Sequence, residues 1–292
     1  VQETGYKKSF SQKIYFEVIR LRMVEISTKY KLGIRRFGLI NWIGVWTLYK
    51  KEVLRFLIVW VQTLLSPIIS SLLFFMVLSV AIGSSRSDML GVSFIVFLAP
   101  GLIAMQIIQQ AFSHSSSSFM IGKIQGNIVD ILYAPLSAGE VTFAIILASV
   151  TRSFMIGAVS IFIFYFLVDI QIRSFSVVIF YTFISSFILG SIGVMAGLWA
   201  EKFDHMASVT NFIIIPLSFL SGTFYTIDNL PNFLQVISMC NPFFYMIDGF
   251  RYGFLDQSDG SIFVGSLYLI LLAIVLWLMT YFLYKKGYKI KS

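Results

Sequence analysis

The sequence predicts an all-α integral membrane protein with about six transmembrane helices, an amphipathic cytoplasmic N-terminal segment and short re-entrant outer helices before the last span. Hydrophobic residues make up 58% of the 292 residues and charged residues only 12%, about half the charged share of an average soluble domain. Several uncharged runs exceed the roughly 20 residues that a helix needs to cross a bilayer. A soluble core would interrupt such runs with charges every turn or two, so the composition argues against a water-soluble fold.

The basic residues predict how the chain is oriented. The formal net charge is +8, and the lysines and arginines lie mainly in residues 7–55 and in the tail 285–292. Positive residues that flank membrane helices stay in the cytoplasm, so both termini are predicted to be cytoplasmic, as an even number of spans requires. The N-terminal basic segment is too long and too polar for a secretory signal peptide. The positive charge is thus explained without a nucleic-acid partner.

Six apolar runs are long enough to span a membrane with some tilt. They lie at about 56–83, 93–112, 141–168, 175–199, 206–224 and 261–284. Pro67 lies in the first run, which a membrane helix tolerates by finding another partner for the carbonyl that the proline leaves free. The polar run 113–118 and the segment 122–140 are then expected to form one cytoplasmic connection, and residues 201–205 a tight inner loop.

Residues 230–247 are uncharged but are not expected to form a span. They contain Pro231 and the pair Asn241 and Pro242, which would break a single helix near its start and its centre. Two short re-entrant or outer helices are predicted instead.

Two amphipathic helices are predicted before the first span. Residues 14–26 carry an apolar stripe at helical spacing, and residues 41–55 combine Trp42 and Trp46 with basic residues that can reach lipid headgroups. The predicted organisation is a cytoplasmic and interfacial segment 1–55, a membrane domain 56–284 and a basic cytoplasmic tail 285–292.

The sequence lacks the patterns of an enzyme or a metal site. The single cysteine, Cys240, cannot form an intrachain disulfide, and no Cys/His cluster is present. The apolar runs contain no paired carboxylates, and the chain has no GxxxxGK[ST] loop for nucleotide phosphates. We predict no catalytic residue, no metal site and no cofactor in this chain, and any ATP hydrolysis must belong to another subunit.

Three isolated ionisable residues each allow two interpretations. His114 could pair with a neighbouring serine, but a solvated loop cap is favoured for His114 and for His205. Arg152 is the only ionisable residue inside an apolar run, which gives little support to ion coupling. It could face a polar pathway, where an anionic headgroup could pair with it, or snorkel to the membrane interface; snorkelling is favoured.

Two segments resemble those of a known family. Residues 122–137, GKIQGNIVDILYAPLS, closely resemble the cytoplasmic coupling loop of type-2 ABC exporter permeases. Residues 219–225, FLSGTFY, followed by Leu230 and Pro231 and by residues 241–252, NPFFYMIDGFRY, look like that family's SG…LP…NP…R pattern. The resemblance runs from about residue 46 to the end and is nearest to nodulation-factor, polysaccharide and drug exporter permeases. Thr226 stands where many relatives carry proline, and residues 1 to about 41 lie outside the match.

The resemblance implies a role for both segments. It implies that the first couples to an ATPase through Lys123, Gln125, Gly126, Asn127, Ile128, Val129, Asp130, Ile131 and Tyr133. It implies that an outer re-entrant motif is formed by Ser221, Gly222, Leu230, Pro231, Asn241, Pro242 and Arg251. A short amphipathic helix in the first segment can lie in a groove on a soluble ATPase, with Ile128, Ile131 and Leu132 as its apolar contacts.

The resemblance further implies the membrane-spanning permease subunit of an ATP-binding-cassette exporter in the cytoplasmic (inner) membrane of a bacterium. Two copies would surround a pathway, and separate ABC ATPase subunits would bind ATP and Mg²⁺. A secondary transporter or channel and a membrane scaffold are the alternatives. No pathway residue is assigned, and the aromatic and serine-rich spans suit an amphipathic or lipid-linked substrate more than an ion.

Overall fold

The computed structural model describes residue 38 and residues 40–82, 89–168 and 170–290. From Trp42 onward these residues belong to one structural unit. Regular structure among them is helical, and the pairing of Met89 with Val92 is an isolated bridge. The predicted all-α membrane fold is confirmed. The amphipathic helix predicted for residues 14–26 lies outside the described residues.

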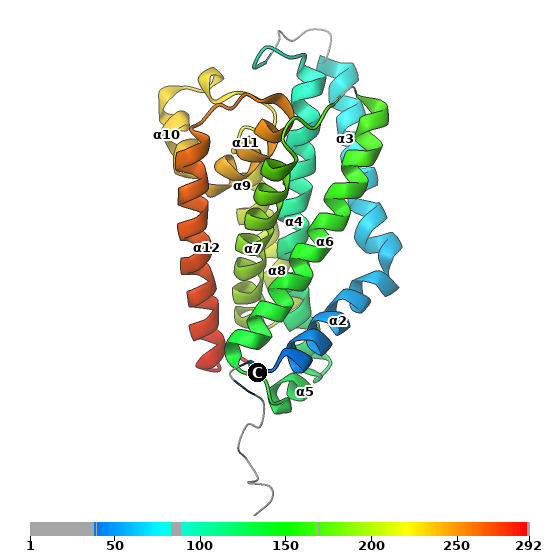
Figure 1. Cartoon of the computed structure of the whole chain (residues 1–292), viewed down its shortest axis with the longest axis vertical. Helices are drawn as coiled ribbons and strands as arrows, with labels where there is room; N and C mark the ends of the chain where they lie inside the picture. Colours follow the sequence, from blue (N-terminus) through cyan, green and yellow to red (C-terminus); the bar gives the residue numbers. More distant parts are fainter. Residues whose placement is uncertain (1–37, 39, 83–88, 169, 291–292) are drawn as a thin grey trace, which may run out of the picture. The chain divides into compact units, whose positions relative to one another are not determined.

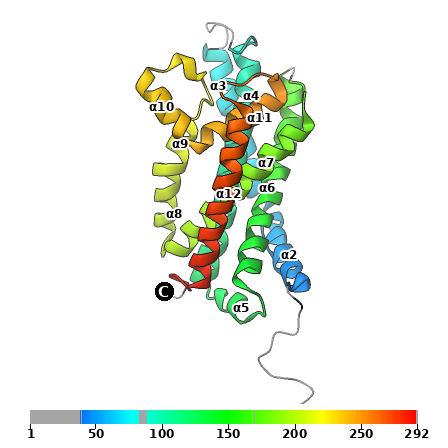
Figure 2. The same ribbon diagram turned by 60° about the vertical axis from the view of Figure 1, so that its left-hand side comes forward.

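Among the described residues, 5 helical stretches are long and apolar enough to cross a membrane. They are Val61–Ala81, Phe94–Ile124, Ala138–Leu167, Phe175–Trp199 and Ile262–Lys285. The first contains a π-helical turn, η1 (Val61–Leu65), and α3 (Ser66–Ile82); the others are, in order, α4, α6, α7 and α12. Figures 1 and 2 show them running roughly along one direction.

The remaining predicted span is present as an interrupted helix. α8 (Phe203–Val209), a second π-helical turn, η2 (Thr210–Ile214), and α9 (Ile215–Phe219) follow one another directly. Pro216 lies in the first turn of α9 and has no N–H for a helical hydrogen bond, which accounts for the irregular turn before it. The prediction of about six spans thus corresponds to 5 long ones and this interrupted segment.

The two ends of the bundle carry different charges. One end bears α2 (Trp42–Ile58), α5 (Ile128–Tyr133) and the end of α12 (Figure 1). We call it the basic end because of Lys123, Lys202, Lys285, Lys286 and Lys289. The opposite end bears η3 (Ile227–Asn229), α10 (Asn232–Cys240) and α11 (Pro242–Leu255) (Figure 2). We call it the acidic end because of Asp228, Asp248, Asp256 and Asp259. The predicted break at Asn241 and Pro242 is confirmed.

Small residues bring α4 and α7 into close contact. A Cβ atom added to Gly193 of α7 would lie 2.6 Å from the carbonyl oxygen of Phe112, and one added to Gly197 would lie 2.8 Å from that of Ser116. A Cβ atom added to Gly190 would meet side chains instead, those of Ser149 and Ile146 on α6 and of Ser115 on α4. Small residues let membrane helices approach closely where lipid provides no hydrophobic driving force. α4, α6 and α7 are accordingly the buried centre of the bundle, whereas α3 and α12 are largely exposed.

α4 is longer than predicted. The sequence places the end of the second span at about residue 112 and the serine run 113–118 in a cytoplasmic connection, but α4 continues to Ile124, so this boundary is wrong. The hydroxyls of Ser116 and Ser117 each donate to the carbonyl three residues earlier. The hydroxyl of Ser118 donates to the carboxylate of Glu52 instead, so these three hydroxyls find their acceptors inside the protein.

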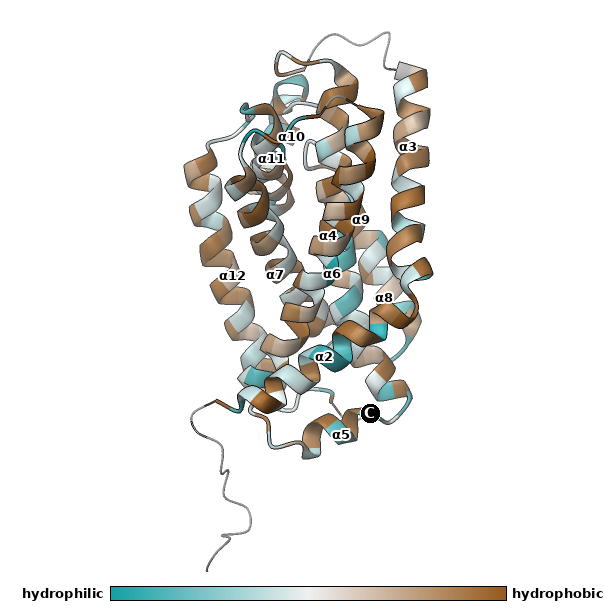
Figure 3. Ribbon diagram, turned by 45° about the vertical axis from the view of Figure 1, so that its right-hand side comes forward, coloured by the Kyte–Doolittle hydropathy of each residue, from teal (hydrophilic) through white to brown (hydrophobic). Residues whose placement is uncertain are grey.

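Hydrophobic residues predominate along the outer helices α3 and α12 (Figure 3). On α3 the exposed residues include Leu73, Met76, Val77 and Val80, and on α12 they include Leu267, Leu271, Val275 and Met279. α2 exposes Trp42 and Trp46 and buries Val45, Leu48 and Phe56. This two-sided α2 agrees with the interfacial helix predicted for residues 41–55.

Replacing Gly193 by alanine is expected to destabilise the bundle, because the new methyl group would meet the α4 backbone. Overpacking of this kind typically costs about 1 to 3 kcal/mol. The measurement is the thermal unfolding temperature of the purified protein in one detergent. Gly139→Ala is the matched control, since a Cβ there comes no closer than 3.7 Å to its neighbours. Equal unfolding temperatures for the two variants would contradict the role of the close approach.

Candidate functional site

A cavity of about 1120 Å³ lies beside α4. η1 and α3 line it on one side and α4 on another, with further residues from α2, α6 and α9. Sites for drug-sized molecules measure roughly 300 to 1,000 Å³, so the cavity is large enough to hold such a molecule.

Polar side chains form two stripes in this cavity. The α4 stripe consists of Gln106, Gln109, Gln110, Ser113 and Ser117. The stripe on η1 and α3 consists of Gln62, Ser66 and Ser70. Residues three or four positions apart share one face of a helix. The sequence analysis assigned no pathway residue, and this recurrence of Gln and Ser inside apolar runs is the signal that could have found them.

Arg152 faces the cavity from α6. It is 7% exposed, and its Nη2 donates to Oε1 of Gln110 and, at 3.2 Å, to the backbone carbonyl of Thr63. Pro67 has no N–H to donate to the carbonyl four residues earlier, which is that of Thr63. Arg152 therefore supplies the partner that the proline leaves missing. The favoured prediction that Arg152 snorkels to the interface is wrong, because its guanidinium points into the bundle.

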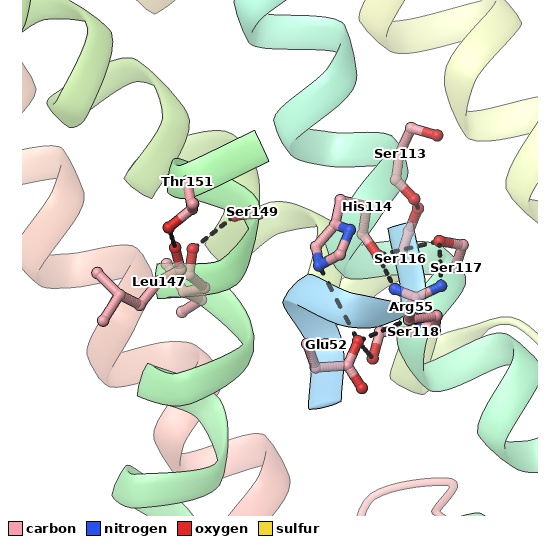
Figure 4. Close-up of polar contacts among 11 residues, drawn as sticks. Glu52, Arg55, Ser113, His114, Ser116, Ser117, Ser118, Leu147, Ser149 and Thr151 are labelled. Carbon is pink, nitrogen blue, oxygen red and sulfur yellow. Dashed lines mark hydrogen bonds and ion pairs between the residues drawn. The ribbon is translucent and has the colours of Figure 1, made fainter. Parts of the chain in front are cut away.

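A buried charge cluster joins α2 to α4 (Figure 4). The carboxylate of Glu52 accepts hydrogen bonds from Nε of Arg55 at 2.9 Å and from Oγ of Ser118 at 2.8 Å. Arg55 also donates to the carbonyl of His114 at 3.2 Å. Glu52 thus neutralises Arg55 inside the protein, and α2 is attached to the helix that lines the cavity.

His114 is buried within α4. It is 0% exposed, and neither ring nitrogen has a hydrogen-bond partner among the described residues. Its ring packs edge-on against Phe56 with the centroids 5.5 Å apart, and Nε2 lies 4.0 Å from a carboxylate oxygen of Glu52. The favoured prediction of a solvated loop cap is therefore wrong for His114. His205 does cap a loop, since its Nδ1 accepts the N–H of Glu201 at 3.4 Å.

The predicted coupling segment forms α5 at the basic end. Gly126 has a φ of +75°, which glycine adopts without strain, and the chain reverses there between α4 and α5. On α5, Val129 is 42% exposed, Leu132 38% and Tyr133 86%. These side chains present an apolar surface at an otherwise polar end of the bundle, which favours contact with another molecule.

Two predicted coupling residues are engaged inside the protein. Ile128 is 6% exposed and contacts Gly122 of α4, so in this conformation it is not available as an apolar contact for an ATPase. Lys123 donates through Nζ to the carbonyls of Leu198 and Ala200, at the C-terminal end of α7, where the helix dipole favours a cation. The exposed polar residues of the segment are Gln125, Asn127 and Asp130, and Ile131 is half-buried.

Two residues of the SG…LP…NP…R pattern, Gly222 and Arg251, are in contact at the acidic end. Arg251 of α11 is 1% exposed, donates through Nη2 to the carbonyl of Gly222 at 2.7 Å, and lies 3.8 Å from the ring centroid of Phe97. Asn241 donates through Nδ2 to the carbonyl of Leu217 at 2.9 Å, and its Oδ1 caps α11. The contacts fasten the interrupted helix to α11 and α4.

The other residues of this pattern have local roles. The hydroxyl of Ser221 donates to the carbonyl of Ser218, and Pro242 is the first residue of α11. Leu230 and Pro231 stand directly before α10 and are exposed or half-buried. The pattern therefore acts mainly in packing, and it brings together segments that are separated in the sequence.

Asp248 holds the loop between α11 and α12. Its carboxylate accepts the backbone N–H groups of Asp259 and Gly260, each at 3.0 Å. Burial, and then the negative charge of Asp248, raise the pKa of Asp259 to about 6, while Arg251 acts in the opposite direction.

Comparison with known proteins identifies the family. The model of the ABC-2 type transporter family matches residues 44–255, which include both segments singled out above. YadH, an inner membrane transport permease of Escherichia coli strain K12, is 34% identical over 253 residues, covering 87% of this chain and 99% of the relative. The chain belongs to the ABC-2 type transporter family.

More distant relatives of the permease are nodulation proteins. Nodulation protein J of Neorhizobium galegae is 23% identical over 237 residues, covering 79% of this chain and 88% of the relative. Nodulation protein J of Rhizobium leguminosarum bv. viciae is 25% identical over 236 residues, covering 77% of this chain and 86% of the relative. The chain is thus a multi-pass membrane protein and the permease subunit of an ABC-2 type transporter.

The family also assigns ATP hydrolysis to a partner. ABC-2 permeases work with separate ABC ATPase subunits, so the predicted role as a non-enzymatic permease is confirmed. Among the described residues, no group of three or more His, Cys, Asp and Glu side chains could hold a metal ion.

Asp259 predicts a pH dependence of stability. An unfolded Asp has a pKa of about 3.9, and the folded value is about 6, so the protonated form is favoured on folding. This contribution is complete below the unfolded pKa and is lost as the pH rises through about 6. As the pH rises from about 4 to about 6, the unfolding temperature of the parent should fall. The unfolding temperature of Asp259→Asn should fall less over the same range. Asp256→Asn, an exposed position in the same loop, is the control. Identical profiles for parent and Asp259→Asn would refute the assignment.

Proposed function

We propose that this permease forms an export pathway together with a second copy, and that ABC ATPase subunits docked at the basic end drive it. The observation that carries the proposal is the cavity of about 1120 Å³ lined by facing polar stripes within a bundle whose outer helices are apolar. A closed structural bundle would fill such a space with side chains. A polar lining at membrane depth is a feature of transport pathways.

α4 supports the link between the cavity and an ATPase. It is a single helix of 31 residues that begins at the acidic end, lines the cavity and ends at Ile124, just before the turn at Gly126 that leads into α5. A force applied to α5 therefore acts on a continuous rigid element that carries the polar stripe. The bond from Lys123 to the end of α7 extends the connection to the centre of the bundle. ATP and Mg²⁺ are bound by the ATPase in this mechanism, and different contacts in its two states shift the permease between conformations.

The exposed surface of α3 supports pairing with a second copy. α3 packs against α4 and leaves Leu73, Met76, Val77 and Val80 uncovered. Because η1 and α3 form one wall of the cavity, a second copy placed against this helix would help to enclose the pathway.

We expect both termini in the cytoplasm, because the basic end bears the C-terminal end of α12 and the lysines. A phosphatase reporter fused after Ser292 should be inactive and one inserted after Asn229 should be active, and fluorescent-protein fusions at the same points should give the reverse pattern. An active phosphatase at Ser292 would contradict this orientation and the placing of the ATPase at the basic end.

The ATPase contact is expected to depend on the exposed face of α5. Replacing Leu132 and Tyr133 by aspartate should weaken association with the ATPase by about 1 to 2 kcal/mol or more for each contact. The fraction of the partner ABC ATPase that co-purifies with the permease measures this loss. Val236→Asp on α10, which changes an exposed apolar residue (64% exposed) at the other end, is the control. Native mass spectrometry of the parent complex should give two permeases and two ATPases.

Full ATPase recovery with the Leu132/Tyr133 double variant would show that α5 is only a connector. Since both side chains are exposed, their replacement leaves the packing of Ile128 intact, and a normal unfolding temperature of the variant excludes a general loss of structure.

A further inference from the structure

The cavity contains a positive charge that no carboxylate among the described residues neutralises. Its lining includes two guanidinium groups, those of Arg55 and Arg152, and no carboxylate. Arg55 is paired with Glu52 at 2.9 Å. The hydrogen bonds of Arg152 go to neutral acceptors, the amide of Gln110 and the carbonyl of Thr63, and its buried Nε has no partner among the described residues. A charge removed from water is costly unless an opposite charge accompanies it.

The lining also changes character along the bundle. Toward the acidic end it is apolar, with Phe74, Leu102, Met105, Ile215 and Phe219. At the level of Arg152 and toward the basic end it carries the polar residues Gln106, Gln109, Gln110, Ser113 and Ser117, together with Phe56, Val59 and Ile121. A molecule that matches this lining has an acidic, hydrogen-bonding group at one end and an apolar body at the other.

We infer that the cavity binds the anionic headgroup of an amphiphile at Arg152, with Gln106, Gln109 and Gln110 as neutral hydrogen-bond partners and the apolar body directed toward the acidic end. This inference names a substrate class for the proposed export pathway and rests on that function. In the proposed orientation, the bound molecule lies as a lipid of the cytoplasmic leaflet does, with its headgroup toward the basic end. A phosphate or carboxylate headgroup meets the requirement equally well.

The guanidinium geometry explains why a positive residue is suited to this position. Arg152 is already oriented by Gln110 and Thr63, so it loses little side-chain freedom when an anion binds. Charge-assisted hydrogen bonds from a pre-oriented guanidinium to an oxyanion are among the strongest in proteins.

The test measures binding of dodecyl phosphate to the permease in nanodiscs of zwitterionic phosphatidylcholine, with empty nanodiscs subtracted. The parent should bind it saturably and much more tightly than dodecyl maltoside, which has the same tail and no charge.

Gln110→Glu places a carboxylate where Arg152 already donates, so it should reduce binding by about tenfold or more and raise the unfolding temperature. Gln171→Glu, the same substitution at an exposed residue outside the cavity, should bind as the parent does. Arg152→Gln should also lose binding, and the Gln110 variant serves if Arg152→Gln does not fold.

Several results would overturn the inference. The first is that Gln110→Glu binds dodecyl phosphate as tightly as the parent does, and the second is that the parent binds dodecyl maltoside as tightly as dodecyl phosphate. The third is that inorganic phosphate displaces dodecyl phosphate at a similar concentration, which would mean that only an anion is recognised. An anionic lipid that co-purifies with the permease and resists exchange with dodecyl phosphate would identify a structural lipid and overturn the substrate assignment. These measurements need no ATPase, so they fail or succeed independently of the α5 variants.

Discussion

The close approach of α4 and α7 is the contact on which the rest of the structure depends. With glycines at 193 and 197 of α7, the backbone of α7 meets that of α4 around Phe112 and Ser116. In lipid, where burial of apolar surface provides little drive for helix association, such packing is a main source of stability. It directs one face of α4 into the bundle centre, and the Gln and Ser residues on another face line the cavity. The same helix therefore serves as packing core and pathway wall.

Irregular backbone and buried polar groups occur together throughout the bundle. At membrane depth each free backbone group needs a partner from the protein. Pro67 frees the carbonyl of Thr63, and Arg152 donates to it. Farther along the chain, the turn at Gly222 leaves its carbonyl to Arg251, which also packs on Phe97. Arginines thus stabilise two breaks in the helices, one at the cavity and one at the acidic end.

The connection between the two ends of the permease is mechanical. α4 reaches from the acidic end to α5, and α2 is attached to it by Glu52 and Arg55, next to the cavity. α4 therefore connects α5, which bears the proposed ATPase contact, with the glutamines that lie beside Arg152 in the proposed headgroup site. Movement of α4 would change the shape of the polar wall without requiring the helices to unfold.

The sequence alone determined the fold class, the position of α7 at 175–199, the break at Asn241 and Pro242, and membership of an ABC permease family, because run length, proline chemistry and motif spacing are local properties. Only the tertiary structure decided where α4 ends and where Arg152, His114 and Ile128 point. A hydropathy pattern scores each residue for its own transfer from water to lipid, without regard to its neighbours in the fold. It therefore placed the end of the second span at the serine run. In the bundle Ser115 and Ser116 lie against glycines of α7, and Arg152 meets a carbonyl freed by Pro67. Whether a polar residue in this protein faces water, a cavity or another helix depends on which groups lie opposite it.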